Sequence, residues 1–350
     1  MQPRAVVKSG ESPAVARRAV RLRSVAVIAC RALVWLYLGA IVLAWLSLRL
    51  GGDRWWWATL LLFGPRWILA LPLIVLAPAA VLLRPRMLWP LAGGASVLCF
   101  GVLGMCAPWP ALLDSESGQP TLRVLTYNVG SGRSDLSGLD RLIDEVRPDV
   151  VALQECSEEL APKFLADPAW RILRKRRLWL ASRHPIEEEQ SVVDSGPLGY
   201  WGAIAMRCRL ETPLGRVRVV NVHLETPREG LDAILGGGFA GRGVLQDDIE
   251  RRAKISALAS GLAGEAPRTL VLGDFNMPAD SAIYRRDWSR FANAFSRAGW
   301  GFGGSKMTRW FSVRIDHALG SGDWRAVRAW VGPQLGSDHR PLIAEWRLAE

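Results

Sequence analysis

The sequence has few cysteines and none of the cysteine patterns of a zinc module. Its five cysteines include no CxxC pair and no zinc-type spacing with histidine. Three of them lie in apolar N-terminal segments. We expect the other two, Cys156 and Cys208, to be small buried side chains without a disulfide between them. The sequence also contains no short-period repeat, which excludes a solenoid or propeller.

A phosphate-binding P-loop is absent as well. The one long glycine-rich stretch, residues 226–243, contains Gly236, Gly237 and Gly238, but no Lys-Ser or Lys-Thr pair follows it. We predict a loop there, for which a mobile lid and a disordered insertion are equally good interpretations.

The basic excess of the chain is unevenly distributed. The formal net charge is +11, of which residues 1–120 carry +8 and residues 121–350 only +3. Because the C-terminal part is close to charge balance, the high isoelectric point does not by itself indicate a nucleic-acid-binding protein. The basic run at residues 171–177 could contact a phosphate backbone, lipid headgroups or only solvent.

Long uncharged runs fill the N-terminal third of the sequence. The runs at residues 32–48, 67–83 and 87–108 predict three transmembrane helices. We expect the basic residues before them to be unstructured and cytoplasmic. The boundaries that follow are a basic tail at 1–23, a three-helix transmembrane region at 24–108, a linker at 109–120 and a C-terminal domain at 121–350.

The charges between the apolar runs predict their orientation. Basic residues crowd the N-terminus and recur at Arg84 and Arg86, whereas Asp114 and Glu116 follow the third run. By the positive-inside rule, the N-terminus is cytoplasmic and the C-terminal domain lies outside the cytoplasmic membrane. A re-entrant hairpin within the second run, residues 55–83, would reverse this orientation.

Residues 121–350 alternate short strands with helical stretches and hairpins. This pattern predicts an α/β sandwich of two sheets rather than a doubly wound parallel sheet. The stretch Gly273-Asp-Phe-Asn276 directly follows the apolar strand at residues 268–272. Asp274 and Asn276 therefore stand at the C-terminal end of a buried strand, where α/β enzymes place their chemistry.

Similar polar residues close several other predicted strands. Carboxylates with an asparagine form a hard-oxygen site that suits Mg²⁺ or Mn²⁺ and not zinc. Histidines nearby can transfer protons near neutral pH, and Asp316 can hold His339 in one tautomer. Such a set suits the attack of water on phosphorus. The candidate residues are Asn128, Glu155, His223, Asp274, Asn276, Asp316, Asp338 and His339.

Six motifs over residues 121–350 resemble, in the same order, those of the endonuclease/exonuclease/phosphatase superfamily. The three apolar runs and the stretch His-Leu-Glu-Thr-Pro-Arg-Glu-Gly230 resemble its bacterial membrane-anchored members, some of which hydrolyse polyprenyl pyrophosphate. The six motifs are Thr-Tyr-Asn128, Leu-Gln-Glu155, Asn-Val-His223, Gly-Asp274-Phe-Asn276, Ile-Asp316-His and Ser-Asp338-His339-Arg-Pro.

The resemblance implies a metal site. Glu155 would be the main ligand of Mg²⁺ or Mn²⁺, and Asn128 and Asp338 would help to hold the ion. No other cofactor is implied.

The resemblance also implies a set of catalytic residues. Asp274 would orient or deprotonate the attacking water, and Asn276 would contact the phosphate. His223 would bond one phosphate oxygen. His339, backed by Asp316, would bond another.

The predicted function is that of a membrane-anchored, Mg²⁺-dependent phosphohydrolase. We expect it to cleave a phosphate ester or pyrophosphate by water attack, on a lipid-linked substrate outside the cytoplasm. The alternative is a metal-dependent endonuclease or exonuclease acting on DNA or RNA. A phospholipid-binding pseudoenzyme is disfavoured by the complete set of acids and histidines, and a transporter by the lack of paired charges within the apolar runs. The sequence leaves the substrate, the metal and the oligomeric state open.

Overall fold

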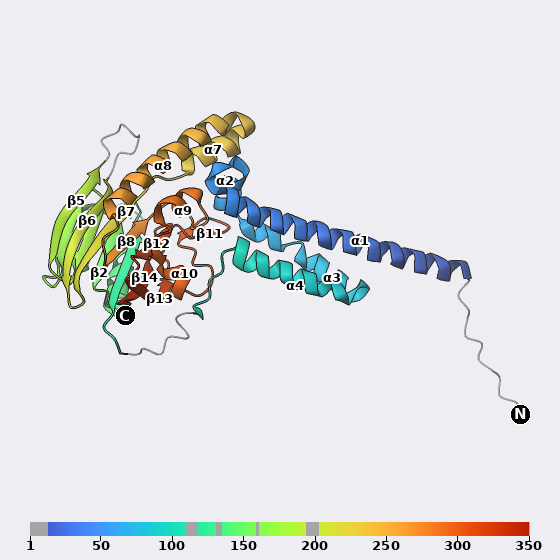
Figure 1. Ribbon diagram of the computed structural model, residues 1–350, viewed down its shortest axis with the longest axis horizontal. Coiled ribbons are helices and arrows are strands. Elements are labelled where there is room, and N and C mark those ends of the chain that lie inside the picture. Colours follow the sequence, from blue (N-terminus) through green and yellow to red (C-terminus); the bar gives the residue numbers. More distant parts are fainter. Residues whose placement is uncertain (1–12, 110–117, 131–134, 159–160, 194–202, 350) are drawn as a thin grey trace, which may run out of the picture. The chain divides into compact units, whose positions relative to one another are not determined.

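The computed structural model describes residues 13–109, 118–130, 135–158, 161–193 and 203–349. These residues form two compact units, which are coloured along the chain in Figure 1. The first unit comprises the chain up to Leu46 together with Arg66–Leu103, and the second comprises Ser47–Pro65 together with Gly104–Glu350.

The first unit is helical. Its elements are α1 (Pro13–Leu46), η3 (Arg66–Ala70), α3 (Leu73–Leu83), η4 (Pro85–Met87), α4 (Leu88–Ser96) and the π-helical turn η5 (Val97–Val102).

Two of the three predicted membrane spans have the length that a span needs. The segments Val20–Arg54 and Arg66–Leu83 are long and apolar enough to cross a membrane. The third prediction was wrong in extent, because α4 and η5 follow each other directly and together hold only 15 residues (nine and six), where about 20 are required. The basic tail also differs from expectation, since α1 already begins at Pro13. Proline suits the first position of a helix, and the Ala and Arg residues after it favour helix.

The second unit contains two six-stranded sheets, which confirms the predicted α/β sandwich. The strand order is β13-β14-β1-β2-β4-β3 in the first sheet and β5-β6-β7-β8-β12-β9 in the second. The strands are β1 (Leu122–Asn128), β2 (Val150–Gln154), β3 (Arg171–Lys175), β4 (Leu178–Ser182), β5 (Ile186–Val193), β6 (Ala203–Thr212), β7 (Gly215–His223), β8 (Thr269–Asp274), β9 (Ala292–Asn293), β12 (Asp316–Gly320), β13 (Trp324–Val331) and β14 (Leu342–Leu348), with a separate hairpin of β10 (Lys306–Met307) and β11 (Ser312–Val313).

Apolar side chains on both faces of the strands hold the sandwich together. In β1, Val124 belongs to the core between the sheets, and its neighbour Leu125 belongs to the core under α6. A third core lies between the second sheet and the helices α8 and α9. The helices of this unit are α2 (Trp56–Phe63), α6 (Leu136–Val146), α7 (Arg228–Gly237), α8 (Arg242–Ala263), α9 (Ala282–Trp288) and α10 (Ala294–Ala298), with short turns η1 (Ser47–Gly51), η2 (Gly52–Arg54), η7 (Lys163–Ala166) and η8 (Gly238–Gly241).

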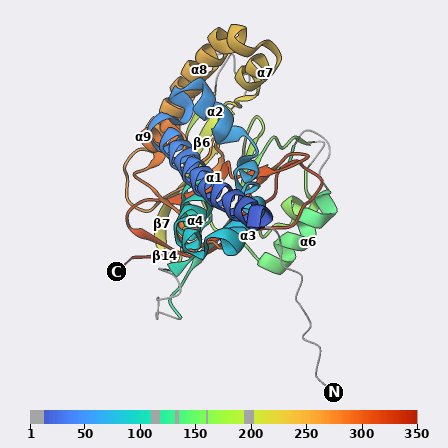
Figure 2. The ribbon, with the colours of Figure 1, turned by 90° about the vertical axis from the view of Figure 1, so that its right-hand side faces the viewer.

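The glycine-rich stretch at residues 226–243 is not the predicted loop but the helix α7 followed by η8. Ile234 is buried, and α7 packs along α8, as both views of the ribbon show (Figures 1 and 2). A Cβ atom at Gly230 would lie only 2.8 Å from Leu245 Cδ1, so glycine permits the close approach of the two helices. Packing against α8 therefore overrides the low helix propensity of the glycines.

A buried carboxylate attaches Ser47–Pro65 to the rest of the second unit. Asp53 accepts hydrogen bonds from the backbone N–H groups of Ala282, at 2.7 Å, and Ile283, at 3.3 Å, which begin α9. The Ser281 hydroxyl donates to the same carboxylate at 2.6 Å. The carboxylate also lies 3.9 Å from the guanidinium of Arg252, and both side chains are fully buried. A buried charge with this many partners is costly to separate from them.

One buried histidine belongs to the core rather than to the site. His317, on β12, lies with Nε2 2.9 Å from the Met277 carbonyl oxygen and Nδ1 3.1 Å from the Asn293 amide. Its ring contacts Phe275 and Tyr284. Burial, with a smaller effect from the charge of Arg314, lowers the pKa of His317 to about 4.

This buried imidazole makes the stability of the domain depend on pH. Between the ordinary histidine pKa of 6.5 and about 4, the unfolded chain binds the proton at His317 and the folded chain does not. The free energy of unfolding should therefore fall by up to about 3 kcal/mol as the pH drops through this window, at about 1.4 kcal/mol for each pH unit. Denaturant titrations of the full chain in detergent should show a shallower pH slope for His317→Gln than for His184→Gln. Equal slopes for the two variants would contradict this assignment.

Candidate active site

The strand ends of both sheets bring the predicted site residues together. Asn128 and His223 close β1 and β7, and Asp274 closes β8. The parallel pairing of β7 with β8 puts His223 beside Asp274. Strand β12 runs antiparallel to β8, so its first residue, Asp316, pairs with Asp274, the last residue of β8. Residues that are far apart in sequence thus meet at one edge because the strand registers align them.

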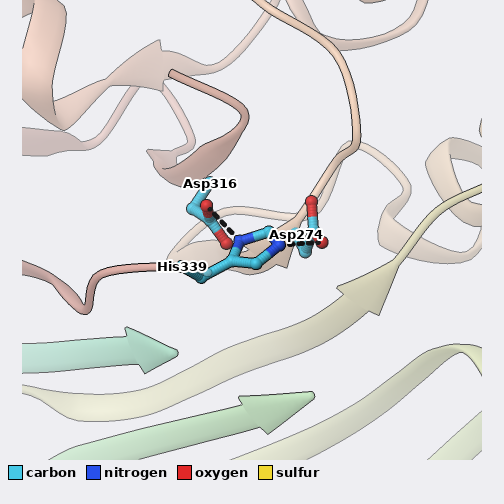
Figure 3. Close-up of side chains that lie close together, drawn as sticks. All are labelled: Asp274, Asp316 and His339. Carbon is cyan, nitrogen blue, oxygen red and sulfur yellow. Dashed lines mark hydrogen bonds and ion pairs between the residues drawn. The ribbon is translucent and has the colours of Figure 1, made fainter. Parts of the chain in front are cut away.

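The centre of the site is a histidine between two buried carboxylates (Figure 3). His339 Nδ1 lies 2.9 Å from Asp316 Oδ2, and His339 Nε2 lies 3.6 Å from Asp274 Oδ2. The backbone N–H of Asp316 donates to Ser305 Oγ at 3.0 Å, and the N–H of His339 donates to Ser337 Oγ at 3.1 Å. These bonds hold both ends of the pair, so the imidazole has one fixed orientation.

The two carboxylates raise the proton affinity of this imidazole. Burial alone would lower the pKa of His339, but the charges of Asp316 and Asp274 outweigh it and raise that pKa to about 9. Burial also raises the pKa of Asp274, and the nearby charge of Asp316 adds to the increase. The two acids therefore favour the protonated form of His339, in which Nε2 can donate a hydrogen bond.

A second group of side chains adjoins Asp274 on the side of the first sheet. The Asn128 side-chain amide donates to Glu155 Oε1 and to Asp274 Oδ2, both at 3.0 Å. His223 Nε2 lies 3.7 Å from Glu155 Oε1 and 3.9 Å from Asp274 Oδ2. Glu155 adopts a left-handed backbone with φ of 55°, an uncommon conformation for glutamate that is frequent at functional sites.

Asp338 lies at the rim of the site. It forms an ion pair with Lys306, and its Oδ1 lies 3.9 Å from His339 Nε2. Burial would raise the pKa of Asp338, but Lys306 lowers it below its usual value, and the charges of His339 and Arg228 act in the same direction. The described contacts of Asp338 thus connect it to His339 and Lys306 rather than to Glu155.

The Asn276 amide is directed at the backbone in this structure. Its Nδ2 donates to the Leu224 carbonyl oxygen at 2.8 Å, and its backbone N–H donates to Asp274 Oδ1 at 2.8 Å. Asn276 is also left-handed, with φ of 50°. It therefore shapes the turn that presents Asp274, and the phosphate contact expected from the sequence stays a prediction.

The donor atoms of the site fit a hard divalent cation. Glu155 and Asp274 bring carboxylate oxygens to the same asparagine amide, and oxygen ligands are those that Mg²⁺ and Mn²⁺ prefer. Asp274, Asp316 and His339 also have possible ligand atoms within 4.8 Å of one another. Since Asp316 and His339 already pair with each other, Glu155 and Asn128 are the better candidates to hold an ion.

Sequence reasoning missed Lys306. Its ammonium lies 3.1 Å from His339 Nε2 and pairs with Asp338, although it belongs to the short hairpin of β10 and β11, far from both in sequence. No motif surrounds Lys306 that could have indicated this position. The isolated bridge between Lys306 and His339 in the backbone explains why the lysine reaches the site.

Comparison with known proteins identifies the family of the chain. A sequence model described as the endonuclease/exonuclease/phosphatase family matches residues 125–339, which is more than half of the chain. No curated protein matches the chain.

Solved structures with similar folds have low sequence identity to this chain. A protein from Beutenbergia cavernae DSM 12333, described as an endonuclease/exonuclease/phosphatase, is 18% identical with a TM-score of 0.48, over 66% of this chain and 72% of that chain. The 3' phosphatase NExo from Neisseria, bound to a product DNA hairpin, is 16% identical with a TM-score of 0.48, over 65% and 100%. TDP2 from D. rerio, complexed with a single-strand DNA product, is 14% identical with a TM-score of 0.48, over 65% and 100%.

The family match covers five of the six sequence motifs completely and reaches His339 in the sixth. The chain belongs to the endonuclease/exonuclease/phosphatase family, whose members are metal-dependent hydrolases of phosphate ester bonds.

Proposed function

We propose that this chain is a membrane-anchored, Mg²⁺-dependent phosphohydrolase that cleaves a lipid-linked phosphate ester or pyrophosphate outside the cytoplasm. The observation that carries the chemical part is the arrangement of His339 between Asp316 and Asp274, beside the Asn128–Glu155 pair. It combines a cationic donor, a buried carboxylate base and hard-oxygen ligands in one cluster.

Each side chain has a step in the proposed reaction. Asp274 orients the attacking water and accepts its proton as the water oxygen bonds to phosphorus and the P–O bond to the leaving group breaks. His339, held by Asp316, donates from Nε2 to a phosphate oxygen on which negative charge increases. His223 donates to a second oxygen, and Lys306 adds positive charge at the rim. A divalent ion held by Glu155 and Asn128 would neutralise phosphate charge and polarise the P–O bond.

The anchor at Asp53 supports the proposed location of the domain. Ser47–Pro65 is joined to the catalytic domain by buried hydrogen bonds to Asp53, and we therefore propose that both lie on the same side of a membrane. The basic N-terminus favours a cytoplasmic start, and a single crossing by α1 then places Ser47–Pro65 outside. On this proposal, the segment Arg66–Leu103 enters the bilayer and returns to the same side.

The basic run at residues 171–177 gives little support to the nuclease alternative. Arg174 pairs with Glu158 at 3.3 Å and stacks on Trp179, and Lys175 lies 3.5 Å from Glu188. These partners occupy part of the charge that a phosphate backbone would need. A tether at the membrane instead raises the effective concentration of lipid-borne phosphates near the site.

Removing the charge of Glu155 tests the proposed metal site. Glu155→Gln keeps the shape of the side chain but removes the charge that binds the cation. The turnover of a phosphodiester by the full chain in detergent, measured over a Mg²⁺ titration, should fall about 100-fold or more, since changes to residues behind metal ligands alone cost about 10- to 100-fold. Glu158→Gln, at an exposed position three residues along, is the matched control and should keep full activity. Unchanged turnover of Glu155→Gln at saturating Mg²⁺ would remove Glu155 from the metal site.

Protease accessibility tests on which side of the membrane the catalytic domain lies. Protease added to intact spheroplasts should digest the catalytic domain, while an epitope tag at the N-terminus should survive until the membrane is lysed. A protease site inserted after Arg54 should also be cut in intact spheroplasts, because that segment and the domain belong to one compact unit. Protection of the domain in intact spheroplasts would refute the extracytoplasmic assignment and favour cytoplasmic substrates.

A further inference from the structure

A group of large apolar side chains on the second unit comprises four exposed residues and the half-buried Trp56, none of which is among the catalytic residues described above. We call it the aromatic patch and define it as Trp55, Trp56, Trp57, Leu235 and Phe239. Trp55 and Trp57 are 39% and 48% exposed, and Leu235 and Phe239 are 75% and 70% exposed. Contiguous exposed apolar surface of this kind marks an interaction site more often than isolated apolar residues do.

Ring contacts join two separate segments of the chain into this patch. Trp55 stacks on Trp57 with centroids 5.4 Å apart, and Trp56 meets Phe239 of η8 at 5.5 Å. The guanidinium of Arg242 lies 3.9 Å from the Phe239 ring centroid and 4.9 Å from that of Trp56. The patch therefore combines indole and phenyl rings with an exposed cation, which is the composition that settles at the headgroup level of a bilayer.

The chain on either side of the tryptophans identifies what covers the patch. The tryptophans at residues 55–57 lie between two segments, Val20–Arg54 and Arg66–Leu83, that are each long and apolar enough to span a membrane. On the proposed function, the segment Ser47–Pro65, which contains the tryptophans, must therefore lie at the bilayer surface. It is not a free linker, because Asp53 anchors it to α9, and Ala58, Thr59 and Leu62 of α2 are buried. The tryptophans therefore have a fixed position on the catalytic domain. On the proposed function, they also lie close to the surface of the bilayer.

Helix α7, which carries part of the patch, begins close in sequence to the active site. It starts at Arg228, five residues after His223, and Leu235 lies two turns further along. Phe239 follows in η8, directly after α7. A surface that fixes α7 and η8 therefore restrains the chain that leaves the site at His223.

We propose that the aromatic patch inserts into the headgroup region of the bilayer and so holds the active site against lipid-borne phosphates. This inference rests on the proposed function and adds the surface that orients the domain. The binding partner is the lipid–water interface, with Arg242 beside the lipid phosphates and the rings at the level of the glycerol backbone.

The direct test places a fluorophore on the patch of the full chain. Phe239→Cys is labelled with a small environment-sensitive dye, in a chain whose five native cysteines are alanine, and reconstituted in vesicles that contain brominated lipids. The matched control is Leu258→Cys, labelled in the same way. Leu258 is also exposed and lies on α8 outside the patch. Quenching should be at least about threefold stronger at position 239 than at 258. Equal quenching at the two positions would overturn the proposal.

The functional test compares two substrates in the same vesicles. Leu235→Ser with Phe239→Ser should lower kcat/KM about tenfold for a polyprenyl pyrophosphate in the bilayer and less than twofold for water-soluble bis(p-nitrophenyl) phosphate. Leu258→Ser should change neither value. An equal loss for both substrates, or no loss for either, would overturn the role of the patch. If the unmodified chain hydrolyses neither substrate, the proposed function fails, and the quenching experiment still decides whether the patch meets the bilayer.

Discussion

The register between β8 and β12 is the constraint on which the rest of the site depends. It pairs the last residue of one strand, Asp274, with the first residue of the other, Asp316. Two buried carboxylates so close together would repel each other without a cation between them. His339 supplies that cation, with 2.9 Å to one acid and 3.6 Å to the other. The imidazole thus offsets the repulsion between the two carboxylates, and the carboxylates hold the imidazole in one orientation.

A third buried carboxylate, Asp53, connects the site to the segment Ser47–Pro65. Asp53 holds the start of α9 and lies beside Arg252, whose guanidinium approaches the Asn276 carbonyl oxygen at 3.4 Å. The turn that presents Asp274 is therefore supported from behind by a segment more than 200 residues earlier. This connection explains why Ser47–Pro65 belongs to the catalytic unit rather than to the helical one.

The sequence predicted the sandwich because strand periodicity is a local signal. The strand-end motifs, also local, indicated candidate site residues, whose roles stay predictions. The sequence could not predict Lys306 or the anchor at Asp53, because each depends on a contact between distant segments. The glycine-rich stretch at residues 226–243 was misread for a related reason. Its helix forms only against α8, where Gly230 allows close packing. The third apolar run, residues 87–108, was predicted to span the membrane from its composition alone. Its helical part, α4 and η5, is shorter than the apolar run.

The central claim is that Asp316 acts in the reaction through His339, and a double-mutant cycle tests it most directly. Asp316→Asn and His339→Ala should each lower the kcat of the full chain about 100-fold or more, the usual effect of losing a hydrogen-bond donor to charge that develops in the transition state. The double variant should lose less than about threefold beyond His339→Ala, because the carboxylate has no role without the imidazole. Losses that multiply in the double variant would show that the two residues act independently and would contradict the account.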